Sequence, residues 1–163
     1  MIPTVNSILF TTDLSENSTY ALRHAAAMVQ ATGAKLHILH VTEPLSDEAR
    51  ITMQIFLQDK AARQDAMEAK AAHVKSVLAE RQKNFWAAMP EADRGIQEHI
   101  ASIEVVEGYP AEVILRRAKE LGCDLIVLGA HDHGFSQTFL GTVAKRVLRR
   151  ATIPTLVVPY QPD

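Results

Sequence analysis

The chain has 163 residues, of which 47% are hydrophobic, and its 17 basic and 19 acidic side chains give a formal net charge of −2. This length suits one globular domain over residues 1–163, and the balanced charge gives no electrostatic reason to expect nucleic acid or an anionic membrane as a partner. A single cysteine, no signal-peptide pattern and apolar runs far below the roughly 20 residues of a membrane helix predict a cytoplasmic chain with no disulfide framework and no membrane span.

The first quarter of the chain predicts a strand, a helix and a second strand. The β-rich run Val5–Thr12 is followed by apolar residues at helical spacing, which end at Gly33. Candidate N-cap residues of this helix are Asp13, Ser15 and Ser18. The run Lys35–Val41 then alternates imperfectly, as expected for a strand that is covered on both faces.

A long polar and alanine-rich stretch separates this half from the next. From Asp47 to about Met89 there is no glycine or proline until Pro90, and apolar residues recur along one face. This pattern predicts one long helix or two in succession. This stretch, with Phe85 and Trp86 near its end, is expected to pack in the core or to cover the ligand cleft, rather than to act as a recognition helix.

The second half of the chain repeats the alternation of strand and helix. Ile100–Glu107 is a strand candidate, and the turn Gly108–Pro110 leads into a helix that ends at Gly122. The remaining predicted elements are the strand Asp124–Leu128, the helix Thr142–Arg150 and the strand Pro154–Val158.

Five strands alternating with four helical stretches predict an α/β fold built from βαβ units. We expect an open, doubly wound parallel sheet with right-handed crossovers and helices on both faces. In such sheets ligands bind outside the carboxyl ends of the strands. The strand ends to consider are therefore those at Asp13, Val41 and Gly129.

The loop after the fourth strand, GAHDHGFSQTFLGT, runs from Gly129 to Thr142 and suits an anion. Its glycines let the backbone approach a phosphate, and free N–H groups at the following helix start can donate to it. Two other interpretations remain open. One is a plain strand-to-helix turn, and the other is a metal site on His131, Asp132 and His133, although alternate residues of an extended loop point apart.

Several segments together resemble the universal stress protein family over essentially the whole chain. The resemblance rests on ILFTTDLSENSTYALRHA, LHILHV, VVEGYPAEVIL, CDLIVLGAH and GTVAKRVLRRATIPTLVVP. It implies a five-stranded parallel sheet of order 3-2-1-4-5. It also implies a homodimer in which the last strand, Pro154–Val158, meets its copy across a two-fold axis.

One branch of that family binds ATP through Gly, two residues, Gly, nine residues, Gly, then Ser or Thr. Gly129 matches the first glycine, and the pair Gly141-Thr142 matches the last two positions. Asp132 replaces the middle glycine, and only eight residues separate it from Gly141, so the loop is one residue short. Gly134 does not restore either spacing.

The Asp132 carboxylate opposes phosphate. At about 6 Å from one phosphate charge it costs about 3 kcal/mol at an effective dielectric constant near 20, which is about a hundredfold in affinity. Three arrangements would offset this repulsion: protonated His131 and His133 beside the phosphates, an Asp132 side chain that faces solvent, or a Mg²⁺ ion held by Asp132 and the phosphates.

The adenosine half of the implied site is better preserved. Asp13, which follows Thr12 at the end of the first strand, resembles the family aspartate that contacts the nucleoside, and Val41 stands where backbone groups read the adenine edge. The implied binding residues are Thr12, Asp13, Val41, Gly129, His131, Asp132, Gly134, Gly141, Thr142 and Val143. Without the resemblance, Asp13 is equally well explained as an N-cap residue, a role that can coexist with binding, and Val41 is better explained as a core residue at a strand end.

No pair of nucleophile and base stands at a telling spacing, and Cys123 is expected to be structural. We therefore predict a stress-response protein that binds adenine nucleotide, ATP or AMP with or without Mg²⁺, without efficient catalysis and in concert with an unidentified downstream protein. Slow ATP hydrolysis remains open. The alternative is a nucleotide-independent dimerising module that has lost its phosphate loop.

Overall fold

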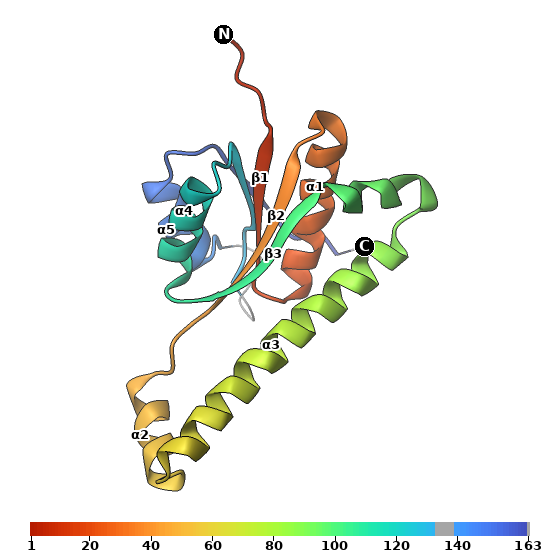
Figure 1. Cartoon of the computed structure of the whole chain (residues 1–163). Helices are drawn as coiled ribbons and strands as arrows, with labels where there is room; N and C mark the ends of the chain where they lie inside the picture. Colours follow the sequence, from red (N-terminus) through yellow and green to blue (C-terminus); the bar gives the residue numbers. More distant parts are fainter. Residues whose placement is uncertain (133–138, 163) are drawn as a thin grey trace.

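The computed structural model describes residues 1–132 and 139–162 and contains one five-stranded sheet (Figure 1). The strands are β1 (Ser7–Thr12), β2 (Lys35–Thr42), β3 (Ile100–Glu107), β4 (Leu125–Gly129) and β5 (Thr155–Val158). Their order is β3-β2-β1-β4-β5, and every neighbouring pair is parallel. This confirms the predicted doubly wound sheet and its strand order.

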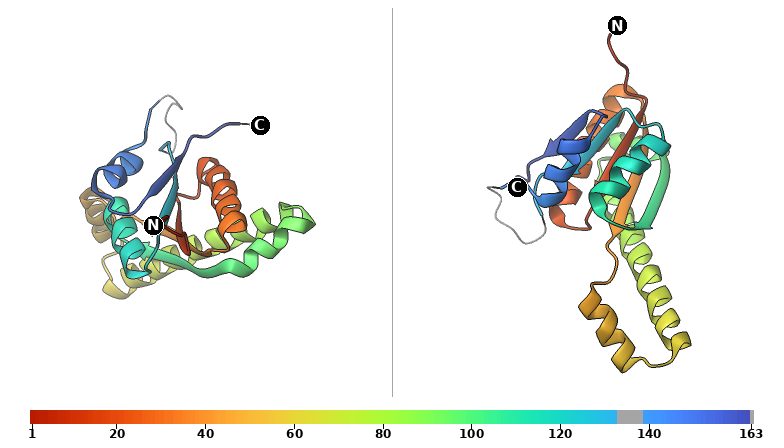
Figure 2. Two further views of the ribbon diagram at one scale, coloured as in Figure 1. Left: turned by 90° about the horizontal axis from the view of Figure 1, so that it is seen from above. Right: turned by 90° about the vertical axis from the view of Figure 1, so that its left-hand side faces the viewer.

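Helices cover both faces of the sheet (Figure 2). One face packs against α1 (Glu16–Thr32), the C-terminal half of α3 (Lys60–Ala88) and the 3₁₀ helix η1 (Glu91–His99). The other face packs against α4 (Pro110–Glu120) and α5 (Thr142–Arg150). The structure differs from the sequence prediction by the addition of η1, whose polar sequence EADRGIQEH shows no apolar run.

The central strand β1 shows why the sheet is buried on both sides. Ile8 and Phe10 belong to the core under α1 and α3, whereas Leu9 belongs to the core under α4 and α5. All three side chains are at most 1% exposed. A continuous apolar run without strict alternation is what a strand between two helical layers requires.

The long helical stretch forms two helices, α2 (Asp47–Phe56) and α3, separated by a break at residues 57–59. None of the residues of α2 is buried, and α2 projects from the sheet together with the N-terminal half of α3 (Figure 1). The buried side chains of α3 lie in its C-terminal half, where Trp86 donates to Gln82 Oε1 at 3.0 Å. Although α3 has 29 residues, neither it nor any other helix in the described parts of the chain is apolar enough to cross a membrane.

The helix ends match the sequence prediction, and the structure selects one of the three candidate N-cap residues of α1. Ser15 is the N-cap of α1 and accepts a hydrogen bond from the Ser18 N–H at 3.3 Å, so Asp13 is not the cap residue. Gly33 and Gly122 adopt φ values of +70° and +65°, the left-handed conformation expected after a helix end. Pro110 is at the first turn of α4.

Asp124 precedes β4 and joins it to the first strand, although the sequence placed this residue inside the strand. Its Oδ2 accepts hydrogen bonds from the N–H groups of Asn6 at 2.7 Å and Ser7 at 3.0 Å. Ser7 is the first residue of β1 and Asn6 precedes it. The strand thus begins two residues later than predicted. Asp124 therefore aligns two strands that are distant in sequence.

Candidate functional site

A cavity of about 90 Å³ lies at the carboxyl ends of the central strands. It brings together residues from the ends of β1, β2 and β4 with residues from the starts of α4 and α5. The predicted site residues that line it are Thr12, Asp13, Val41, Gly129, His131, Asp132 and Val143. Gly141 and Thr142 border it through contacts with Asp132, and Gly134 lies outside the described residues.

The end of β1 supplies a hydrogen-bonded turn at one side of the cavity. Asp13 Oδ1 accepts from both the N–H at 2.9 Å and the hydroxyl of Ser15. Asp13 thus holds the residue that caps α1, while its second carboxylate oxygen makes no hydrogen bond to any described residue. An exposed carboxylate that is oriented by one oxygen keeps the other available for a ligand hydroxyl.

Thr12 stabilises the same turn from inside. Its hydroxyl lies 2.8 Å from Ser18 Oγ and accepts from the Leu14 N–H at 3.0 Å. Leu14 has φ of +66°, a left-handed conformation that costs a non-glycine residue about 1–2 kcal/mol. Strain of this kind often accompanies binding sites, because the surrounding structure must hold it in place.

An apolar wall closes the cavity on the side of β2 and α4. Val41 and Leu39 belong to β2, and Pro110 and Ile114 come from the first turns of α4. Gly108 allows this approach because its φ is +154° and a Cβ there would lie 2.6 Å from Val113 Cγ2. Sequence reasoning did not assign Pro110 and Ile114 to the site, although the Gly-x-Pro turn at a strand end was a signal that pointed there.

Asp132 occupies the start of α5. Its Oδ2 accepts a hydrogen bond from the Thr142 N–H at 2.7 Å, and a Cβ at Gly141 would lie 2.8 Å from Asp132 Cγ. Gly141 is the N-cap residue and has no side chain to cap the helix. The carboxylate of Asp132 therefore acts as the anion at this helix N-terminus, where free N–H groups and the helix dipole favour negative charge.

Two of the three possible metal ligands, His131 and Asp132, line the cavity. His131 Nδ1 lies 3.1 Å from the carbonyl oxygen of Phe139, and His133 lies outside the described residues. Within residues 1–132 and 139–162, no cluster of three His, Cys, Asp or Glu side chains is arranged to hold a metal ion. Two carboxylates line the cavity, Asp13 from the end of β1 and Asp132 from the described part of the loop.

Cys123 lies away from this cavity and is buried, with 6% of its surface exposed. Its Sγ is 3.5 Å from Ser7 Oγ, and burial raises the pKa of the thiol. A thiol with a raised pKa has little thiolate at neutral pH. This environment agrees with the structural role expected from the sequence.

Comparison with known proteins gives a consistent result. The sequence model of the universal stress protein family matches residues 4–159. A universal stress protein of Bacillus subtilis is 30% identical over 155 residues, covering 94% of this chain and 98% of its own length. A universal stress protein of Methanocaldococcus jannaschii is 28% identical over 152 residues, covering 93% of each chain.

Solved structures of similar proteins show the same fold. The universal stress protein UspA from Lactobacillus plantarum superimposes with a TM-score of 0.69 at 22% identity, over 96% of this chain and 99% of its own. A universal stress protein in complex with cAMP superimposes with a TM-score of 0.61 at 23% identity, over 96% and 98% of the two chains. At these identities the likeness shows the fold alone.

Proposed function

Because the chain belongs to the universal stress protein family, we propose that it is a cytoplasmic regulator that binds an adenine nucleoside or nucleotide at the carboxyl ends of β1, β2 and β4. The observation that carries this proposal is the single cavity shared by Thr12, Asp13, Val41 and the start of α5. One fold neighbour is a complex with the adenine nucleotide cAMP. The ligand acts as a signal, without efficient turnover.

The adenosine half of the ligand fits the β1 and β2 side of the cavity. The free oxygen of Asp13 suits a ribose hydroxyl, and the main chain at Val41 suits the edge of the base. Leu39, Pro110 and Ile114 supply the apolar surface that a base needs. The cavity of about 90 Å³ must widen on binding, since small-molecule pockets usually span about 300–1,000 Å³.

The phosphate half meets an internal competitor. A phosphate at the start of α5 must displace the Asp132 carboxylate from the Thr142 N–H, or bear its repulsion. Adenosine and AMP are therefore expected to bind at least as tightly as ATP. A ligand that displaces Asp132 from the Thr142 N–H would change the surface at the start of α5, which a partner protein can recognise.

We predict that Asp132→Asn tightens ATP binding about ten- to a hundredfold, because it removes the charge that faces the phosphates. Adenosine affinity should change by less than about twofold, since adenosine carries no phosphate. Calorimetric titration of the nucleotide-free protein with adenosine, AMP and ATP, each with and without Mg²⁺, measures both effects. Asp65→Asn, an exposed carboxylate on α3, is the matched control.

The outcome separates the functions. Equal changes in adenosine and ATP affinity would contradict the role of Asp132. Tight ATP binding that requires Mg²⁺ and weakens in Asp132→Asn would instead make Asp132 a metal ligand.

A second candidate function is a nucleotide-independent dimerising module. Two observations favour it: the Asp132 carboxylate already accepts the Thr142 N–H at the start of α5, and the cavity has a small volume. Absence of heat with all three ligands up to millimolar concentration, in both the natural protein and Asp132→Asn, together with unshifted melting temperatures, would support this alternative.

The family resemblance also supports a homodimer through β5. This strand is at the edge of the sheet and pairs only with β4 among the described strands. An unpaired strand edge offers backbone donors and acceptors to a second copy.

A further inference from the structure

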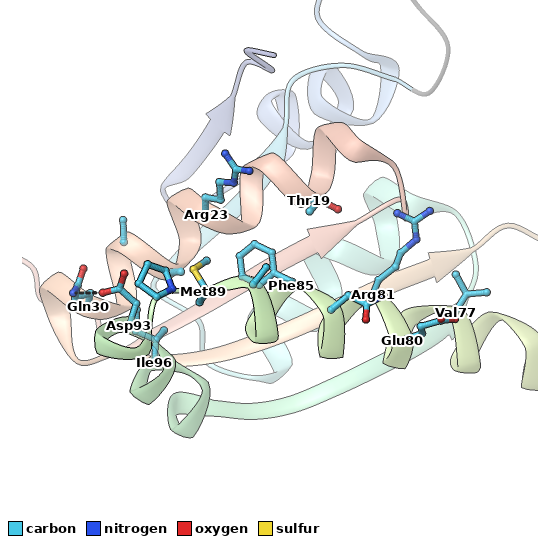
Figure 3. Close-up of a pocket in the computed structure, with 15 residues that line it drawn as sticks. Thr19, Arg23, Gln30, Val77, Glu80, Arg81, Phe85, Met89, Asp93 and Ile96 are labelled. Carbon is cyan, nitrogen blue, oxygen red and sulfur yellow. Dashed lines mark hydrogen bonds between the residues drawn. The ribbon is translucent and has the colours of Figure 1, made fainter. Parts of the chain in front are cut away.

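A second and larger hollow lies on the opposite layer of the molecule from α4 and α5 (Figure 3). It is a groove between α1, the C-terminal half of α3 and η1, with a volume of about 940 Å³. This volume lies within the range typical of small-molecule pockets. Small side chains line it from both helices, Ala26 and Ala27 on α1 and Ala88 on α3.

The floor of the groove is apolar and anchored in the core. Phe85 and Ala26 are buried members of the core under α1 and α3, and Met89 and Ile96 pack against the same core. Figure 3 shows Phe85 and Met89 at the centre of the groove, with Ile96 toward one end. A chain or ring of a ligand placed there would contact carbon on several sides.

The two ends of the groove differ in polarity. At one end Asp93 accepts a hydrogen bond from Gln30 Nε2 at 3.3 Å, so its carboxylate is engaged by a donor (Figure 3). Toward the other end Arg81 and Asn84 lie one turn apart on the same side of α3. Neither of these two side chains makes a hydrogen bond or ion pair with another residue of the described structure.

Other charged side chains also line the groove. Arg23 of α1 adds a second guanidinium to the lining, and its Cζ lies 5.7 Å from the centre of the Tyr20 ring. Glu80 also lines the groove and lies one turn from Asn84 on α3, so an anionic head group must sit on the Arg81 side of Asn84. The guanidinium and amide donors therefore offer charge-assisted hydrogen bonds to an anionic head group.

We infer that this groove is a binding site for an amphiphilic monoanion, a small molecule with an apolar tail on Phe85, Met89 and Ile96 and a carboxylate or sulfonate at Arg81 and Asn84. The inference is independent of nucleotide binding, because the groove shares no predicted site residue with the carboxyl-end cavity.

The chain contains its own reporter of occupancy. Trp86 is the single tryptophan, and its ring meets Phe85 edge to face with ring centres 4.9 Å apart. Phe85 lines the groove and Trp86 lies buried behind it. A ligand that contacts Phe85 should change the fluorescence of Trp86.

The test titrates the full chain with decanoate and, as an uncharged comparison, with 1-decanol, following Trp86 fluorescence and heat in parallel. We expect saturable binding of one decanoate per chain and about fivefold weaker binding of 1-decanol. Arg81→Gln should weaken decanoate about fivefold and leave 1-decanol unchanged. Ala88→Leu, which fills the groove with a good helix former, should weaken both about tenfold.

Matched control variants lie on the other side of α3. Lys83→Gln removes a charge and Ala87→Leu adds the same side chain, both at positions that line a different hollow, so neither should change decanoate binding. Absence of saturable binding, or equal effects of the groove variants and their controls, would overturn the inference. The inference would also be overturned if decanoate bound only after dilution from dimer to monomer, because a second copy would then cover the groove. Decanoate should still bind when AMP is present at saturating concentration. A failure of decanoate to bind would leave the results of the nucleotide titrations unaffected.

Discussion

The protonation of a single side chain depends on the residues around it, as His37 illustrates. It lies on β2 and its Nδ1 is 2.7 Å from Ser102 Oγ on β3. Burial lowers the pKa of His37 below its ordinary value of 6.5, and Arg117 and Lys35 act in the same direction, while Glu104 opposes them. The folded state therefore holds this imidazole neutral more strongly than the unfolded chain does.

This environment predicts a pH dependence of stability. Since the pKa of His37 is lower in the folded state, its contribution is complete above the unfolded value of 6.5 and is lost as the pH falls through 6.5 toward the folded value. Urea unfolding at about pH 7.5 and about pH 5.5 should show that His37→Gln reduces the loss of unfolding free energy on acidification. An equal loss in the natural protein and the variant would show that other groups dominate.

At the scale of elements, the helices α1 and α2 differ in how much of their surface is buried. α1 buries six residues, including Leu22 and Val29, whereas α2 buries none and exposes 57% of Ile51, 62% of Ile55 and 80% of Phe56. An isolated helix of 10 residues is marginal in water without tertiary packing.

The backbone amides of the two helices should therefore differ in their protection from hydrogen exchange. We expect amides of α1 to exchange only on global unfolding and amides of α2 to exchange through local opening of about 1–2 kcal/mol. Mass spectrometry of exchanged peptides resolves them. Protection of α2 equal to that of α1 would mean that a partner or a second copy covers Ile51, Ile55 and Phe56.

At the scale of the whole molecule, the edge strand β5 determines the proposed assembly. The carbonyl groups of Pro154 and Val158 accept hydrogen bonds from Ile126 and Ala130. By the alternation of a parallel ladder, the Val157 N–H points away from β4. Val157→Pro removes that outward donor, so we expect a dimer in the natural protein and a monomer in the variant, measured by light scattering. A variant that remains dimeric with an unchanged circular dichroism spectrum would place the interface elsewhere.

Much of this architecture was predictable from the sequence. Local periodicity and capping residues located the strands and helices within a few residues, because apolar alternation, Gly33 and Pro110 act on neighbouring positions. The family resemblance supplied the strand order and pointed to the ends of β1, β2 and β4, which do meet at one cavity.

Contacts between residues distant in sequence were decided only by the tertiary structure. The sequence showed that Asp132 breaks the phosphate pattern, and the structure shows its carboxylate on the Thr142 N–H, ten residues away. The wall from Pro110 and Ile114, and the groove between α1, α3 and η1, likewise depend on how helices approach the sheet and one another. Periodicity assigns a residue to a face of its own element, but packing chooses which other element covers that face and where a gap remains.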